Sequence, residues 1–250
     1  GSGKSLIIYS LMRHYQTMTD KKILILVPTT SLVEQMYTDF EDYSSESDWC
    51  VEENCHRIYS GKEKETDLQV TISTWQSLYK MPPEYFDQFG VVFGDECHLY
   101  KAKSLTAIME KLVNCPIRIG TTGTLDGTKA HKLMIEGLFG VVFKAASTKD
   151  LINKEILSEF EIDSILLRYP MEICKSYKRL TYQEEISQLI QLQARNDFIT
   201  DLAKKVKGNT LILFQYVKNH GIPLYDQMTS KSKGKVFLVH GGVSADIRED

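Results

Sequence analysis

Short, continuous apolar runs alternate along the chain with longer segments whose apolar residues recur every three or four positions. Runs of this length predict strands that are buried on both faces, as in a parallel sheet. They lie at residues 23–27, 70–73, 91–93 and 117–119. The segments between them, such as residues 31–40, carry the period of amphipathic helices. Strands and helices that alternate in this way predict an α/β fold with a doubly wound parallel sheet.

The pattern also predicts helix boundaries and domain boundaries. Ser31 and Glu34 have the spacing of a helix capping box, and the polar stretch 44–64 predicts a segment rich in loops. From about residue 144 charged and apolar residues mix, and no predicted strand ends in a polar motif. We therefore expect a first domain at 1–143, a linker at 144–180 and the beginning of a second α/β domain at 181–250.

In the second domain the pattern predicts one long helix and then a return to α/β alternation. Residues 181–206 carry an apolar helical face, and residues 210–214 and 236–239 predict strands on either side of a helix around 222–228. A further helix is expected to begin at Ser244. Because two strands cannot close a core, we expect this second domain to be truncated. The sheet of the first domain is expected to lack its first strand.

Composition excludes several classes of protein. The 250 residues are 42% hydrophobic and 25% charged, as in ordinary globular domains. No apolar run approaches the roughly 18 residues of a membrane-spanning helix. The net charge of -3 gives no support to a strongly basic nucleic-acid-binding domain, so any basic groove is local. The five scattered cysteines have no zinc-site spacing and indicate a reducing, cytoplasmic compartment.

The chain opens on Gly1, Ser2, Gly3, Lys4 and Ser5, directly before a predicted helix. These residues match the end of the phosphate-binding loop G-x-x-x-x-G-K-[ST]. In such a loop backbone N–H groups surround the phosphates, the lysine reaches the β and γ phosphates, and the hydroxyl ligates Mg²⁺. The first glycine of the motif and the strand before it would precede residue 1. A flexible helix entry is the competing interpretation.

Two adjacent acids follow the predicted strand 91–93. Asp95 and Glu96 stand where phosphoryl transfer needs carboxylates. Asp95 would hold Mg²⁺ beside Ser5, and Glu96 would orient and deprotonate the attacking water. A solvated acidic turn is the alternative, and the upstream phosphate loop weakens it. We expect His98, next to this pair, to have a coupling role.

Four motifs resemble those of the superfamily 2 helicases and translocases, and they follow one another along the chain in the order that this family has. Residues 95–98, Asp-Glu-Cys-His, resemble the D-E-x-H box, and residues 122–124, Thr-Gly-Thr, resemble the third motif, usually Ser-Ala-Thr. Residues 28–35 and 74–78 are similar to the P-T-x-x-L-x-x-Q and T-x-Q-S-L segments, which contact the backbone of the tracked strand in that family. The layout resembles that of RecG-like and XPB-like members.

The resemblance implies a RecA-like ATP-binding lobe followed by the truncated start of a second RecA-like lobe, with ATP and Mg²⁺ as cofactors. It implies branched DNA as the partner, such as forks, Holliday junctions and R-loops with their RNA strand, and no membrane. The catalytic residues it implies are Lys4, Asp95, Glu96 and His98. ATP contacts are assigned to Gly1, Ser2, Gly3, Lys4 and Ser5, metal ligation to Ser5 and Asp95, and coupling to Thr122 and Thr124. DNA contacts are assigned to Thr29, Thr74, Gln76, His240 and Gly241.

Two other functions stay open at this point. An RNA helicase of the same superfamily would carry the same motifs, because contacts with phosphates do not distinguish ribose from deoxyribose. A nucleotide-dependent switch would need the phosphate loop but has no use for the segments around Thr29 and Thr74. The chain also departs from the family, since Cys97 replaces the usual small residue of the box and the fifth and sixth motifs, with their arginine finger, are absent. Because an arginine finger contributes about 10³–10⁵ in rate, we expect slow hydrolysis from these residues alone.

Overall fold

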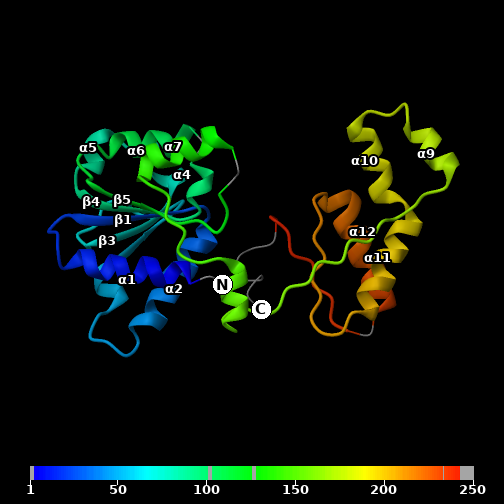
Figure 1. Ribbon diagram of the computed structural model, residues 1–250, viewed down its shortest axis with the longest axis horizontal. Coiled ribbons are helices and arrows are strands. Elements are labelled where there is room, and N and C mark those ends of the chain that lie inside the picture. Colours follow the sequence, from blue (N-terminus) through cyan, green and yellow to red (C-terminus); the bar gives the residue numbers. More distant parts are fainter. Residues whose placement is uncertain (1–2, 101–102, 126–127, 233, 243–250) are drawn as a thin grey trace. The chain divides into compact units, whose positions relative to one another are not determined.

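The computed structural model describes residues 3–100, 103–125, 128–232 and 234–242 (Figure 1). The chain divides into two compact units, one through Glu161 and one from Ile162. This division falls inside the segment 144–180 that the sequence predicts as a linker.

A five-stranded parallel sheet forms the centre of the first unit (Figure 1). Its strand order is β2-β3-β1-β4-β5, and every neighbouring pair is parallel. The strands are β1 (Lys22–Val27), β2 (Cys55–Ile58), β3 (Val70–Thr74), β4 (Phe89–Gly94) and β5 (Ile117–Gly120). The predicted α/β doubly wound parallel sheet is therefore confirmed.

Helices cover both faces of this sheet (Figure 1). One face is covered by α1 (Lys4–Gln16) and α2 (Thr30–Ser44), and these pack against Ile23, Ile25 and Val27 of β1. Leu24 and Leu26 point to the other face, where a second apolar cluster lies. Because both faces are covered, every apolar position of β1 is fully buried, which explains its continuous apolar run. The remaining helices of the unit are α3 (Val51–Asn54), α4 (Trp75–Leu78), α5 (Pro83–Phe86), the 3₁₀ turn η1 (Cys97–Leu99), α6 (Lys103–Lys111), α7 (Lys129–Phe139) and α8 (Thr148–Asn153).

Two local features of this unit differ from the predictions. The segment 44–64, predicted to be rich in loops, also contains α3 and the edge strand β2. In β2 only Cys55 and Ile58 are buried, so the strand has too little apolar pattern to be recognised. Helix α2 is capped by Thr29, whose hydroxyl accepts a hydrogen bond from the Leu32 amide, and not by Ser31.

Gly94 ends β4 at a point with no room for a side chain. A Cβ atom there would lie 2.7 Å from the Tyr100 hydroxyl oxygen and 2.8 Å from Cζ of Phe139. Tyr100 is fully buried, so it has little space to move.

We expect Gly94→Ala to lower the free energy of unfolding by about 1–3 kcal/mol, measured by urea denaturation. Gly137→Ala is the control: it is helical with open space around it, and we expect it to stabilise the protein by about 0.5–1 kcal/mol. Equal stability of the two variants would contradict this assignment.

The second unit is helical in the residues that the structure describes. It contains α9 (Met171–Tyr177), α10 (Tyr182–Gln191), α11 (Gln193–Lys205), the π-helical turn η2 (Val217–Gly221) and α12 (Ile222–Lys231). The prediction of one helix over 181–206 is wrong, because Leu192 leaves helical geometry with φ -61° and ψ 113°. The side-chain nitrogen Nδ2 of Asn196 donates to the Ile190 carbonyl at 3.1 Å, which satisfies an acceptor near the end of α10.

The strands predicted at 210–214 and 236–239 are also not found among the described residues of this unit. Leu211 and Phe237 are 84% and 73% exposed. A strand needs a hydrogen-bonded neighbour, and the described part of the unit pairs none with these segments. The helix predicted around 222–228 is confirmed as α12, and the one expected from Ser244 lies outside the described residues. Within the described ranges, no helix combines the length and apolar character needed to cross a bilayer.

Candidate functional site

The polar motifs of the first unit converge at one edge because its strands are all parallel. Backbone hydrogen bonds continue past the strand ends and tie the loops together. The Asp95 amide donates to the Leu26 carbonyl, the Thr121 amide to the Gly94 carbonyl, and the Cys97 amide to the Thr121 carbonyl, each at 2.9 Å. The loop after β4 is therefore tied to β1 and to the loop after β5, and the loop after β5 is tied to the end of β4.

Gly3, Lys4 and Ser5 of the predicted phosphate loop line a cavity of about 220 Å³ together with the two acids. Gly3 caps α1 in the left-handed conformation, with φ 73°, which glycine adopts without a Cβ penalty. This size is below the roughly 300–1,000 Å³ that encloses a drug-sized ligand, so the cavity can take the phosphate end of a nucleotide. Its lining residues are Gly3, Lys4, Ser5, Leu32, Gln35, Met36, Asp39, Asp95 and Glu96.

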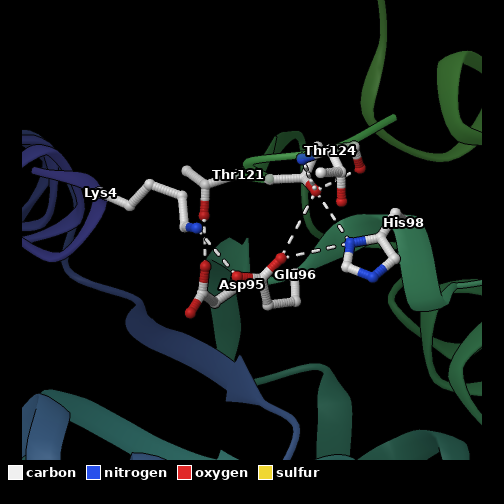
Figure 2. Close-up of polar contacts among 7 residues, drawn as sticks. Lys4, Asp95, Glu96, His98, Thr121 and Thr124 are labelled. Carbon is white, nitrogen blue, oxygen red and sulfur yellow. Dashed lines mark hydrogen bonds and ion pairs between the residues drawn. The ribbon is translucent and has the colours of Figure 1, made fainter. Parts of the chain in front are cut away.

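An ion pair joins the two sides of this cavity. Lys4 Nζ lies 2.8 Å from Glu96 Oε1, and Figure 2 shows the lysine reaching across from α1. Glu96 has φ 47° and ψ 48°, a left-handed conformation that is uncommon for a residue with a side chain. Such backbone strain gathers at functional sites, and the residue that carries it here is the one paired with Lys4.

The other carboxylate oxygen of Glu96 belongs to a polar network (Figure 2). Glu96 Oε2 lies 3.2 Å from His98 Nδ1, and His98 Nδ1 lies 2.9 Å from Thr122 Oγ1. The Thr122 hydroxyl donates to the Thr124 carbonyl at 2.8 Å and accepts from the Thr124 amide at 3.2 Å. The predicted coupling residues Thr122 and Thr124 are thus linked to Glu96 in two ways, through His98 and through the Thr122 hydroxyl, which lies 3.5 Å from Glu96 Oε2.

Asp95 is buried, with 8% of its surface exposed. Its Oδ1 accepts a hydrogen bond from the Thr121 hydroxyl at 2.9 Å, which leaves Oδ2 for another ligand. The described residues contain no group of three His, Cys, Asp or Glu side chains that could hold a metal ion. Mg²⁺ needs no such group, because it binds through one or two protein oxygens together with phosphates and water. Ser5 and Asp95, both on the cavity wall, fit that requirement.

Cys97 is enclosed between the acids and β5. Only 4% of Cys97 is exposed, and a Cβ atom added at Gly120 would lie 3.0 Å from the Cβ atom of Cys97. Burial, and then the charges of Glu96 and Asp95, raise the pKa of the Cys97 thiol to about 11. The thiol is therefore neutral at physiological pH and acts as a small apolar side chain.

The predicted DNA-contact residues of the first unit have different environments. Thr29 is exposed, while Thr74 is 5% exposed and its hydroxyl is 2.9 Å from that of Ser77. Gln76 is exposed and donates to the Pro28 carbonyl at 3.3 Å, which links the two predicted segments. Thr29 and Gln76 are therefore the side chains available to a ligand.

The remaining predicted residues lie elsewhere. His240 and Gly241 belong to the second unit, where the Gly242 amide donates to His240 Nδ1 at 3.1 Å. Gly1 and Ser2 lie outside the described residues.

Several residues at the site belong to no motif that the sequence revealed. Thr121, which binds Asp95, stands beside the Thr122 motif and could have been found there. Asp39 lines the cavity one turn after Gln35 on α2, so helical spacing is its only signal. Tyr43 lies farther along α2, and its hydroxyl is 2.9 Å from the Ser5 hydroxyl. No local pattern connects it with the phosphate loop.

The motifs resemble those of superfamily 2 helicases and of the T-even bacteriophage recombination helicase UvsW. Comparison with known proteins supports this resemblance. The protein named ATP-dependent DNA helicase uvsW, from Enterobacteria phage T4, is 38% identical over 254 residues. The match covers 99% of this chain and 49% of that protein, so the chain spans about half the length of this relative.

Two solved structures are similar as well. The crystal structure of the UvsW helicase from bacteriophage T4 is 39% identical, with a TM-score of 0.50 over 57% of this chain and 50% of that one. The Hef helicase domain of Pyrococcus furiosus is 18% identical and has a TM-score of 0.55 over 93% of this chain and 49% of that one. The second likeness supports a RecA-like helicase fold.

Residues 1–127 match the family described as type III restriction enzyme, res subunit. The chain belongs to this family, among the superfamily 2 helicases that its motifs resemble.

Proposed function

We propose that this chain forms the ATP-hydrolysing part of an ATP-dependent DNA helicase or translocase. Its substrate would be branched DNA, such as forks, Holliday junctions and R-loops, in recombination, repair and replication. The observation that carries the proposal is the cavity where Lys4 and Ser5 meet Asp95 and Glu96. The relative named a DNA helicase supports DNA as the partner. Because that relative comes from a phage, the host cytoplasm is the proposed compartment.

The proposed chemistry begins with an exchange of partners at Lys4. Lys4 gives up its ion pair with Glu96 and binds the phosphate oxygens of ATP, aided by the helix N-terminus behind Gly3. Ser5 and Asp95 would hold Mg²⁺, and the ion would supply positive charge where negative charge develops on the phosphates. The released Glu96 carboxylate then accepts a proton from the attacking water.

The network beyond Glu96 supplies a path for coupling. His98 contacts both Glu96 and Thr122, so a change at Glu96 alters the hydrogen bonds that hold the loop after β5. Gln76 links the two segments that carry the proposed DNA contacts. We propose that backbone contacts at Thr29 and Gln76 grip one strand in a way that is independent of base sequence.

A comparison of nucleic-acid substrates tests this function in the full-length protein. We expect ATP-dependent strand separation on a forked DNA, and no comparable activity on a structured RNA of the same sequence at the same salt concentration. Preferential unwinding of the RNA would assign the protein to RNA. Nucleotide binding without strand separation or stimulation of hydrolysis on either substrate would assign it to the nucleotide-dependent switches.

A further inference from the structure

The hydroxyl groups of Ser5 and Tyr43 lie 2.9 Å apart, although the two residues are 38 positions apart in the sequence. Ser5 is in the first turn of α1, and Tyr43 is near the end of α2. These two helices contact each other on the same face of the sheet (Figure 1). The contact therefore connects the predicted magnesium ligand with a second helix.

The ring of Tyr43 lies at the edge of an aromatic cluster and contacts one member of it, Tyr9. Its centroid lies 5.6 Å from that of Tyr9, which in turn lies 5.3 Å from Phe40 and 5.7 Å from Trp49. Tyr43 is 38% exposed, and its hydroxyl end meets Ser5. Aromatic pairs at these distances attract each other, so the contact with Tyr9 supports the position of the Tyr43 ring whose hydroxyl meets Ser5.

Helix α2 also forms a wall of the nucleotide cavity. Leu32, Gln35, Met36 and Asp39 follow one another along the cavity at helical spacing. Tyr43 stands one turn beyond Asp39 on the same helix, so the cavity wall and the Tyr43 hydroxyl are parts of one rigid element.

A serine hydroxyl that ligates Mg²⁺ must direct its lone pairs at the metal and its proton elsewhere. Asp95 Oδ1 already accepts a hydrogen bond from Thr121. The Tyr43 oxygen stands at hydrogen-bonding distance from Ser5 and can accept this proton. Partners of this kind orient metal ligands and raise metal affinity.

We propose that Tyr43 is a positioning residue for Ser5: its hydroxyl oxygen accepts the Ser5 proton and so turns the Ser5 lone pairs toward the Mg²⁺ of the bound nucleotide. This inference rests on the proposed function, because it assumes that the cavity binds a magnesium nucleotide. Its direct consequence is that Tyr43 affects the magnesium-dependent part of nucleotide binding and not the part that needs no metal.

Equilibrium binding of a fluorescent, non-hydrolysable ATP analogue to full-length Tyr43→Phe tests this. The variant keeps the ring and loses only the hydroxyl. We expect about 10-fold weaker binding in Mg²⁺ and unchanged binding in EDTA. We also expect a higher Mg²⁺ concentration for half-maximal ATP hydrolysis. Equal affinities of wild type and variant in Mg²⁺ would overturn the proposal, as would an equal loss in Mg²⁺ and in EDTA.

Matched variants separate this inference from the proposed function. Tyr9→Phe removes a hydroxyl from the same cluster without touching the Ser5 contact, and we expect it to bind like the wild type. Ser5→Ala should weaken binding in Mg²⁺, and adding Tyr43→Phe to it should have no further effect. If Ser5→Ala lowers the affinity and Tyr43→Phe does not, only the inference fails. If Ser5→Ala has no effect, the magnesium site and the inference fail together.

Discussion

Glu96→Gln is expected to slow ATP hydrolysis by about 10²–10⁴-fold, the range that a positioned general base contributes. The amide has the size of the carboxylate but cannot take a proton from water. It also carries no charge, so it competes less with phosphate for Lys4, which lies 2.8 Å from Glu96 in the structure. Nucleotide affinity should therefore stay equal or increase.

The measurement is kcat for ATP hydrolysis by the full-length protein, together with the Kd of a fluorescent nucleotide. Glu84→Gln is the control, because Glu84 is an exposed acid on α5 outside the cavity. A kcat for Glu96→Gln within about twofold of wild type would remove Glu96 from the role of general base. A loss of nucleotide affinity would show instead that Glu96 supports binding.

Lys4→Ala is expected to weaken nucleotide binding by about 10–100-fold. The variant removes the cation that lines the cavity beside Ser5 and Asp95, and hydrogen bonds to charged groups contribute about 1.5–3 kcal/mol. Titration of a fluorescent ATP analogue gives the affinity. Lys132→Ala is the matched control, because Lys132 is an exposed lysine of α7 paired with Glu136. Equal affinities for the two variants would show that the cavity does not bind phosphate through Lys4.

The sheet of the first unit was predictable because strands that are buried on both faces consist of continuous apolar residues. Residues 23–27 form an apolar run since β1 lies between two layers of helices. A parallel sheet then brings the ends of its strands to one edge, which is why Ser5, Asp95 and Glu96 could be expected together. The short edge strand β2 buries only Cys55 and Ile58, and two separated apolar positions leave no recognisable pattern.

The finer geometry of the site depends on contacts that no local pattern records. Glu96 has a left-handed backbone that no sequence pattern indicates, and its pairing with Lys4 joins residues 92 positions apart. The Tyr43 contact with Ser5 needs the packing of α1 on α2. In the second unit, helical periodicity continues through Leu192, so the break between α10 and α11 is a matter of backbone conformation that periodicity does not report.

The most direct test of the account is the rate of ATP hydrolysis by the full-length protein with and without forked DNA, for the wild type and for Lys4→Ala. If the cavity drives a DNA-tracking motor, forked DNA should raise the rate of the wild type, and Lys4→Ala should abolish both the basal and the stimulated rate. Undiminished DNA-stimulated hydrolysis by Lys4→Ala would contradict the assignment of this cavity as the site of ATP hydrolysis.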